Sequence, residues 1–428
     1  MKKLLVILFA LGLVFSFTAP VMATDVSFTG EYRIRGWYDS NSLLLKDNTV
    51  SNAFYDQRFR LQGVFQVAEG LSVTVRGDVL DGTWGTTPMR GIGAGTTGVD
   101  ANTNNVQFDY AYATFMTALG QVKAGYMADG AWGTTFGNSW TIHGTIQFQT
   151  KLGEDIAFLL KTTKDAENDY NNTAFSDRDD DAYVAALVYL GEGINGGLLY
   201  KYFRYSNYAA DLNYNSVTAH ALIPYVKATF GDLYVEAEAT WASGEAKDSP
   251  SKLLGQLDTD LEGLSYYMMA KYNLGSAYVG GLFAFVQGDD PTTPWTNENV
   301  RGKINSGNDW DPMLILFQDN YPLSVGTDAT TDSNMDNGTI YQVFAGMDID
   351  KLSLKAALAY AKADEKPTGF ADDDYGTEFD VEAAYKIYDN LTYTVGFGYL
   401  WAGDYYKAAT TNEVGDTYLL MNKMVVNF

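Results

Sequence analysis

The residue types that perform covalent chemistry are scarce in this chain of 428 residues. It contains no Cys, which excludes disulfides, thiolate zinc sites, iron–sulfur clusters and c-type haem attachment. Its two histidines are His143 and His220, and no local pattern supplies either with the nucleophile and orienting acid of a hydrolase. Neither a Walker A sequence nor a dinucleotide fingerprint is present. We therefore expect no catalysis and no cofactor.

Charged side chains at every second position are the residues best placed to act on a solute. The basic set is Arg33, Arg35, Arg58, Arg60, Arg76 and Lys123, and the acidic set is Glu236, Glu238, Glu378, Asp380 and Glu382. On opposite walls of a water-filled space, such sets would create a transverse field that orients dipolar solutes and tunes ion preference. Alternatively, the arginines pair with Glu31, Asp56 and Asp78 and only keep an interior wet; the two interpretations are compatible.

A weak metal-binding pattern lies at Asp177, Asp179 and Asp181, which have the D-x-D-x-D spacing of a calcium loop. However, Ala182 stands where the turn glycine belongs, and Val188 stands where the bidentate glutamate belongs. A solvated acidic loop explains these residues better than a weak divalent-cation site. We therefore expect no metal.

The charged residues belong to segments in which polar and apolar positions alternate. In Val26 to Tyr38, the even positions are apolar or glycine, and the odd positions from Ser27 to Arg35 are polar. A period of two over about ten residues indicates a strand with one apolar and one wet face. We assign eighteen strands, to residues 26–38, 54–67, 71–83, 105–117, 121–129, 141–152, 156–163, 182–190, 197–205, 217–230, 233–242, 263–272, 276–287, 339–348, 352–362, 376–388, 391–401 and 416–428. Within the tenth segment, Pro224 cannot donate to a ladder.

The connections between these segments alternate in length. Those after even-numbered strands are short, such as 231–232 and 389–390, and those after odd-numbered strands are long, such as 84–104 and 288–338. This alternation is typical of an antiparallel up-and-down β-barrel in a bacterial outer membrane, with short periplasmic turns and long extracellular loops. Because a bare sheet edge is costly in hydrocarbon, the sheet must close. We predict an all-β transmembrane barrel of about 18 strands.

Both ends of the chain agree with export to that membrane. A basic start, an apolar run and small residues before Ala23 predict a cleaved signal peptide, residues 1–23, ahead of a single barrel domain, residues 24–428. The terminal Phe428 is expected on the lipid face and resembles the C-terminal signature of outer-membrane proteins. Aromatic residues near the outer strand ends are expected to form an interfacial girdle. They are Trp37, Tyr38, Phe54, Tyr55, Trp84, Trp132, Trp140, Trp241, Trp401 and Tyr418.

The longest connection, 288–338, contains the apolar island Met313 to Phe317 between acidic neighbours. Such an island would not be left in water, so we expect it to fold into the barrel mouth and narrow it. The candidate constriction residues are Trp310, Asp311, Pro312, Leu314, Leu316 and Phe317. Packing on the rim and docking of a partner are the alternatives.

The formal net charge of −24 argues against binding to nucleic acid. More Lys and Arg than Asp and Glu fall on the wet faces of the strands, which predicts a weak preference for anions such as small carboxylates. The remaining acids then lie mostly in the outer loops, where they would gather divalent cations and bridge them to lipopolysaccharide.

The C-terminal part carries a family resemblance. The stretches Tyr375 to Asp380, Tyr385 to Leu391, Gly398-Tyr399 and Gly403-Asp404, with Asp309 to Phe317, resemble alginate-export-type porins and related porins of anaerobic proteobacteria. The resemblance implies an eighteen-stranded, usually monomeric barrel. Alginate exporters are expected to have a strongly basic lumen, and this sequence has many acids there.

We predict an outer-membrane porin for passive diffusion of small hydrophilic solutes, as a monomer or trimer. The alternatives are a barrel sheath around a multihaem cytochrome partner, an exporter of an anionic polysaccharide, and an outer-membrane hydrolase that uses His143.

Overall fold

The computed structural model describes residues 25–47, 50–85, 106–139, 141–167, 179–206, 214–248, 259–291, 304–318, 334–408, 410 and 412–428. Its strands are β1 (Asp25–Asp39), β2 (Asn52–Ala68), β3 (Leu71–Thr83), β4 (Val106–Met116), β5 (Gln121–Ala128), β6 (Ile142–Lys151), β7 (Ile156–Ala166), β8 (Asp180–Gly191), β9 (Ile194–Tyr205), β10 (Tyr214–Phe230), β11 (Leu233–Asp248), β12 (Thr259–Leu274), β13 (Ala277–Val286), β14 (Gly338–Ile349), β15 (Leu352–Lys362), β16 (Asp374–Tyr388), β17 (Leu391–Ala402) and β18 (Thr417–Asn427). A short 3₁₀ helix, η2 (Asp404–Lys407), precedes the last strand. No helix among these described residues is long and apolar enough to cross a membrane.

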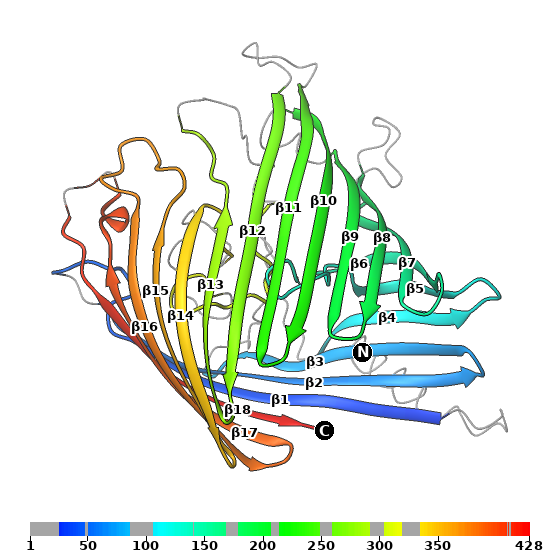
Figure 1. Cartoon of the computed structure of the whole chain (residues 1–428), viewed down its shortest axis with the longest axis horizontal. Helices are drawn as coiled ribbons and strands as arrows, with labels where there is room; N and C mark the ends of the chain where they lie inside the picture. The colour runs from blue at the N-terminus through cyan, green and yellow to red at the C-terminus, as the bar shows by residue number, and fades with distance from the viewer. Residues whose placement is uncertain are drawn as a thin grey trace, which may run out of the picture.

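The strands form one closed antiparallel barrel (Figure 1). Each strand pairs with the next, and β18 pairs with β1, which closes the sheet. Phe428 completes this closure, since it exchanges two backbone hydrogen bonds with Gly30, of 2.7 and 3.1 Å, and its ring stacks on Phe59. Closure leaves no bare edge in the sheet. The predicted fold and the predicted count of eighteen strands are confirmed.

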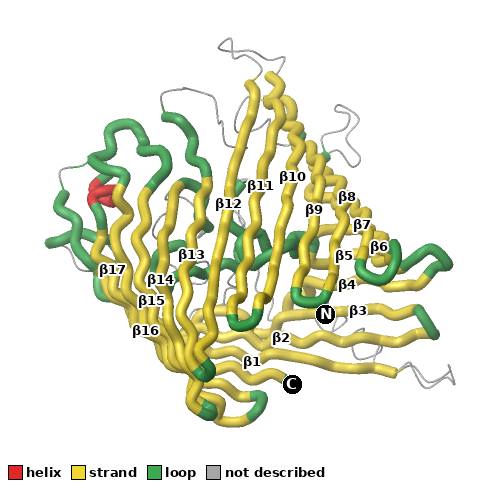
Figure 2. Tube along the Cα trace, viewed as in Figure 1, coloured by secondary structure: helices red, strands yellow, loops and turns green. Residues whose placement is uncertain are grey.

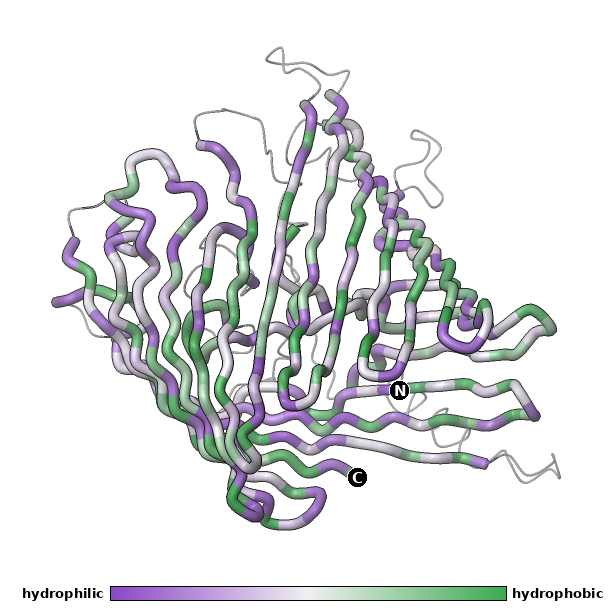
Figure 3. Tube along the Cα trace, in the orientation of Figure 1, coloured by the Kyte–Doolittle hydropathy of each residue, from purple (hydrophilic) through white to green (hydrophobic). Residues whose placement is uncertain are grey.

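Hydrophobic and hydrophilic residues follow one another along the strands (Figure 3). On β14 and β15, Tyr341, Val343 and Leu358 are exposed, whereas the neighbouring Ala357 and Ala359 are buried against the interior. An exposed apolar belt of this kind is the surface that meets hydrocarbon.

The predicted aromatic girdle needs correction at three positions. Tyr55, Trp84, Trp241 and Trp401 are exposed on the outer surface, and Tyr38 and Tyr418 share that face. Trp37 and Trp132 instead point inward, where their indole N–H groups donate to Asp56 Oδ2 (2.7 Å) and to the Ile223 carbonyl (3.0 Å). Phe54 packs against the interior cluster as well. Trp140 lies outside the described residues.

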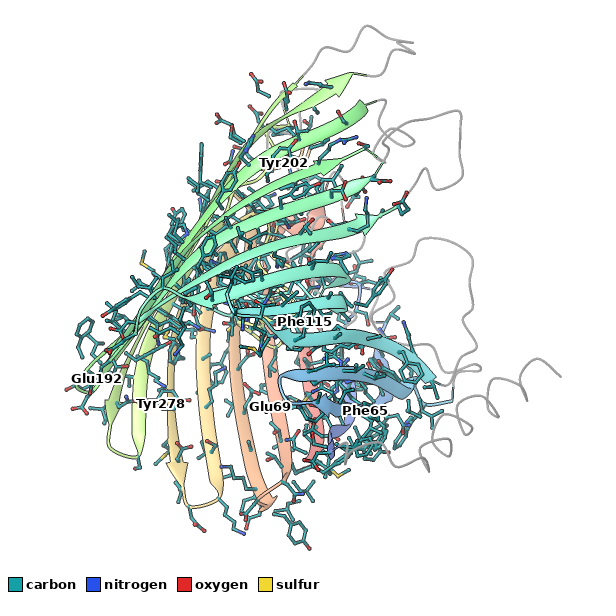
Figure 4. The ribbon with its side chains drawn as sticks, turned by 90° about the vertical axis from the view of Figure 1, so that its right-hand side faces the viewer. Phe65, Glu69, Phe115, Glu192, Tyr202 and Tyr278 are labelled. Atoms are coloured by element: carbon teal, nitrogen blue, oxygen red, sulfur yellow. The ribbon has the colours of Figure 1, made fainter. Side chains whose placement is uncertain are left out.

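The short turns and long connections alternate as the sequence predicts. The turns at Glu69-Gly70 and Glu192-Gly193 join β2 to β3 and β8 to β9, and Figure 4 labels both glutamates at these hairpin ends. Gly70 and Gly193 have φ of 72° and 71°, a conformation that side-chain-bearing residues rarely adopt. Pro224 stays within β10, but pairing with β11 lapses at Ile223 and Pro224.

Candidate functional site: the constricted lumen

Part of the longest connection folds into the barrel. We call residues 304–318 the second in-folded segment, because another such segment, described below, precedes it in the chain. Its residues Trp310 and Met313 to Phe317 are buried, and they form one cluster with inward side chains of the wall. These wall residues include Ala357, Leu400, Leu419 and Met421. Pro312 is buried too, whereas Asp311 is exposed. Loop segments cross the space enclosed by the strands in Figure 2.

Two carboxylates of β16 hold the second in-folded segment against the wall. The backbone N–H groups of Ile315 and Leu316 donate to the two oxygens of Glu378, both at 2.7 Å. The N–H of Leu314 donates to Asp380 at 2.8 Å. Because a buried segment outside the sheet has no ladder partners, its N–H groups need such acceptors. On the same wall, Gln342 of β14 donates to the Pro312 carbonyl at 2.6 Å.

A further in-folded segment, residues 129–139 after β5, was not expected from the sequence. The backbone N–H of Thr134 donates to Glu238 of β11 at 2.5 Å. Phe136 stacks on Tyr267 of β12, with ring centroids 5.3 Å apart. The aromatic residues Trp132 and Phe136 within a connection are the signal that could have indicated it, because isolated large aromatics rarely stay in water. We call residues 129–139 the first in-folded segment.

The two in-folded segments bind to each other inside the barrel. Gly307 N–H donates to the Phe136 carbonyl at 2.6 Å, and Asp309 N–H donates to the Asn138 carbonyl at 3.1 Å. The ring of Trp310 meets Phe136 edge to face, with centroids 5.1 Å apart. A Cβ on Gly307 would lie 1.7 Å from the Asn138 oxygen, so only glycine allows this approach. The segments thus form one connected structure inside the barrel.

These contacts correct the expected role of three acids. Glu238, Glu378 and Asp380 have exposed fractions of 3%, 0% and 4%, because the in-folded segments cover them. They lie on the inner faces of their strands, as predicted. Glu238 and Glu378 serve as anchors, whereas Asp380 both accepts from Leu314 N–H and borders the cavity described below. Glu236 accepts hydrogen bonds from the Tyr234 and Tyr267 hydroxyls, both at 2.7 Å. Glu382 lies 3.5 Å from Lys355.

The predicted arginines line the inner wall, and most are paired with acids. Arg35 binds Asp56 at 2.9 Å, Arg58 binds Glu31 at 2.7 Å, Arg60 binds Asp78 at 2.7 Å, and Arg76 binds Asp109 at 2.5 Å. The Arg76 guanidinium also lies 3.4 Å from the ring centroid of Tyr110. Lys123 lies on β5, opposite Gln147 of β6 and apart from these pairs. The pairing of Glu31, Asp56 and Asp78 with arginines is therefore observed.

A cavity of about 270 Å³ remains between the second in-folded segment and the wall. Its charged lining is Glu31, Arg33, Arg35, Asp311, Lys355, Asp380, Glu382 and Lys423. Arg33 Nε, Arg35 Nη2 and Asp380 Oδ1 are buried atoms that have no hydrogen-bond partner. Four of the lining residues, Arg33, Arg35, Lys355 and Lys423, are cations, the groups that bind a carboxylate.

The weak calcium pattern does not form a cation site in the described residues. Asp179 and Asp181 both bind the Lys164 ammonium, at 2.6 and 2.9 Å, so a cation already neutralises them. Asp177 lies outside the described residues.

Comparison with known proteins finds its matches among solved structures. No family model matches the sequence, and no curated protein matches it. OccK9 (OpdG) of Pseudomonas aeruginosa is similar in structure, with a TM-score of 0.55 and 15% identity over 94% of this chain and 99% of that chain. A BenF-like porin from Pseudomonas fluorescens Pf-5 has a TM-score of 0.54 and 11% identity over the same shares. P. aeruginosa OccK2 (OpdF), in complex with glucuronate, has a TM-score of 0.52 and 12% identity over 94% and 98%.

At these identities the likeness concerns the fold. Together with the closed barrel and the apolar outer belt, it defines the class of fold as the 18-stranded antiparallel β-barrel that these outer-membrane porins share. The three neighbours are Occ-type and BenF-like porins, so they do not extend the resemblance to the alginate-export type.

Proposed function

We propose that this protein is a porin through which small hydrophilic solutes diffuse passively, with a weak preference for anions such as small carboxylates. The observation that carries the proposal is the charged cavity beside the in-folded segments, which Arg33, Arg35 and Lys423 line. The glucuronate bound by OccK2 is itself a sugar carboxylate, in agreement with such a preference.

The in-folded segments weigh against the alternatives. A multihaem cytochrome inside the barrel would need the space that residues 129–139 and 304–318 occupy. Export of an anionic polysaccharide, which the C-terminal resemblance suggested, would need a wide and strongly basic passage, whereas here most arginines are paired with acids. We propose that the barrel functions as a monomer or trimer and that lipopolysaccharide surrounds its outer rim.

Conductance in planar bilayers tests the channel. The purified barrel should give stepwise conductance, and its reversal potential in a salt gradient should show a modest anion preference. A silent bilayer would overturn the channel, and a clear cation preference would overturn the anion assignment.

The double variant Arg33→Gln with Lys423→Gln tests whether the cavity sets the preference. At about 10 Å in water, each charge contributes roughly 0.4 kcal/mol to a passing ion. Loss of both should disfavour an anion by about 0.8 kcal/mol and favour a cation by about the same amount. The anion-to-cation ratio should therefore fall by roughly 15-fold, since about 1.4 kcal/mol is tenfold. The control Lys151→Gln removes a charge at the turn end of β6, away from the cavity, and should leave the ratio unchanged. Equal effects would refute the cavity's role.

A further inference from the structure

Three side chains able to bind a metal ion meet on the inner wall beside the first in-folded segment. Asp129 directly follows β5, His143 lies in β6 and Asp165 lies in β7, so the closed sheet brings them together from adjacent strands. Their ligand atoms lie within 4.8 Å of one another. His143 Nδ1 is 3.1 Å from Asp129 Oδ1 and 3.6 Å from Asp165 Oδ1.

Two of these atoms are buried and form no hydrogen bond of regular geometry. They are His143 Nδ1, which has only the ion-pair contacts with Asp129 and Asp165, and Asp165 Oδ1. Native proteins rarely leave buried polar atoms unsatisfied, and an unseen ion is one of the explanations for those that remain. A cation between the three side chains would satisfy both atoms at once.

The geometry and the donor types fit a divalent transition metal. Tetrahedral zinc with nitrogen and oxygen ligands at about 2.0–2.1 Å places ligand atoms roughly 3.3 Å apart. The distances of 3.1 and 3.6 Å lie on either side of that value. Imidazole with carboxylates suits zinc and its neighbours, whereas calcium and magnesium prefer all-oxygen sites with more ligands.

Two lysine side chains adjoin the three proposed ligands. Lys161 donates to the main-chain carbonyl of Asp129 rather than to its carboxylate. Lys161 and Lys201 are the cations that face the cluster, so two carboxylates and one imidazole meet two ammonium groups.

We propose that Asp129, His143 and Asp165 form a zinc-binding site in the lumen, with water as the fourth ligand. The site lies at the neck of the first in-folded segment, where Asp129 N–H donates to the Thr141 carbonyl at 3.1 Å. The Thr141 hydroxyl donates to Asp129 Oδ1 at 2.9 Å. Bound zinc would tie the start of this segment to β6 and β7.

Zinc binding to the folded barrel tests the site directly, by equilibrium dialysis against zinc chloride followed by elemental analysis. We expect one zinc ion per barrel. His143→Ala and the isosteric Asp165→Asn should each weaken binding by more than about tenfold, since loss of even an outer-shell partner costs roughly 10- to 100-fold. Heat-modifiable migration on a gel verifies that each variant has folded.

The second histidine supplies the matched control. His220 bonds the Tyr200 hydroxyl at 2.6 Å and is exposed on the outer face of β10. His220→Ala should therefore bind zinc as the unmodified protein does. The site is refuted if the folded His143→Ala or Asp165→Asn barrel retains full zinc affinity, or if the unmodified barrel binds no more zinc than they do.

Discussion

Removal of the Glu378 carboxylate should release the second in-folded segment from the wall. In the variant Glu378→Ala, the N–H groups of Ile315 and Leu316 lose both acceptors, which lie at 2.7 Å in the structure. Glu378 has an exposed fraction of 0%, so water does not replace the lost oxygens without opening the segment. The perturbation therefore acts on the docked state alone.

The expected size of the effect follows from those two bonds. A buried donor left unsatisfied costs about 1–3 kcal/mol. Two such donors, Ile315 and Leu316, destabilise the docked segment by about 2–6 kcal/mol, before any loss of packing. Because about 1.4 kcal/mol changes an equilibrium tenfold, the released population should rise by at least roughly 25-fold.

Single-channel recording and proteolysis measure this release. Glu378→Ala should give a larger and noisier conductance, and added protease should cleave within residues 304–318. Glu382→Ala is the matched control for protease resistance, since Glu382 lies four residues further along β16 and contacts Lys355 rather than the segment. A folded Glu378→Ala barrel with unchanged conductance and protease resistance would show that the carboxylate does not hold the segment.

Three other variants test the packing of the lumen and the lipid face. Gly307→Ala places a Cβ against the Asn138 oxygen, so it should separate the two in-folded segments and raise conductance noise in single-channel recordings. Asp56→Ala leaves the buried Arg35 without its partner and should lower the free energy of unfolding in urea by about 3–5 kcal/mol. Lys46→Ala is the control, since Lys46 belongs to an exposed pair with Glu413, and it should change the free energy of unfolding little. Leu61→Arg puts a charge on the lipid face and should cost about 2–4 kcal/mol, seen as poor insertion into vesicles; normal insertion would contradict the assigned strand register.

The barrel could be predicted from the sequence because its signals are local. A strand at 276–287 was expected and β13 spans Ala277–Val286, since alternation and turn residues lie within the strand itself. The apolar island Met313 to Phe317 could be predicted to leave water for the same reason. The first in-folded segment could not be predicted, because Glu238 and Tyr267, the partners of Thr134 and Phe136, lie 104 and 131 residues further along the chain.

An acid on the wet face of a strand has the same sequence pattern whether it faces pore water or holds a folded loop. Glu378 and Glu382 share one face of β16, yet the first binds backbone N–H groups and the second faces the cavity. The charge that a solute meets is therefore not the sum of the formal charges of all inward-facing side chains. Glu238, Glu378 and Asp380 are covered by the in-folded segments, and Glu31, Asp56 and Asp78 each bind an arginine. The cavity is lined by four cations, Arg33, Arg35, Lys355 and Lys423, and by four acids. Its wall is therefore far less acidic than the whole chain, which carries a net charge of −24.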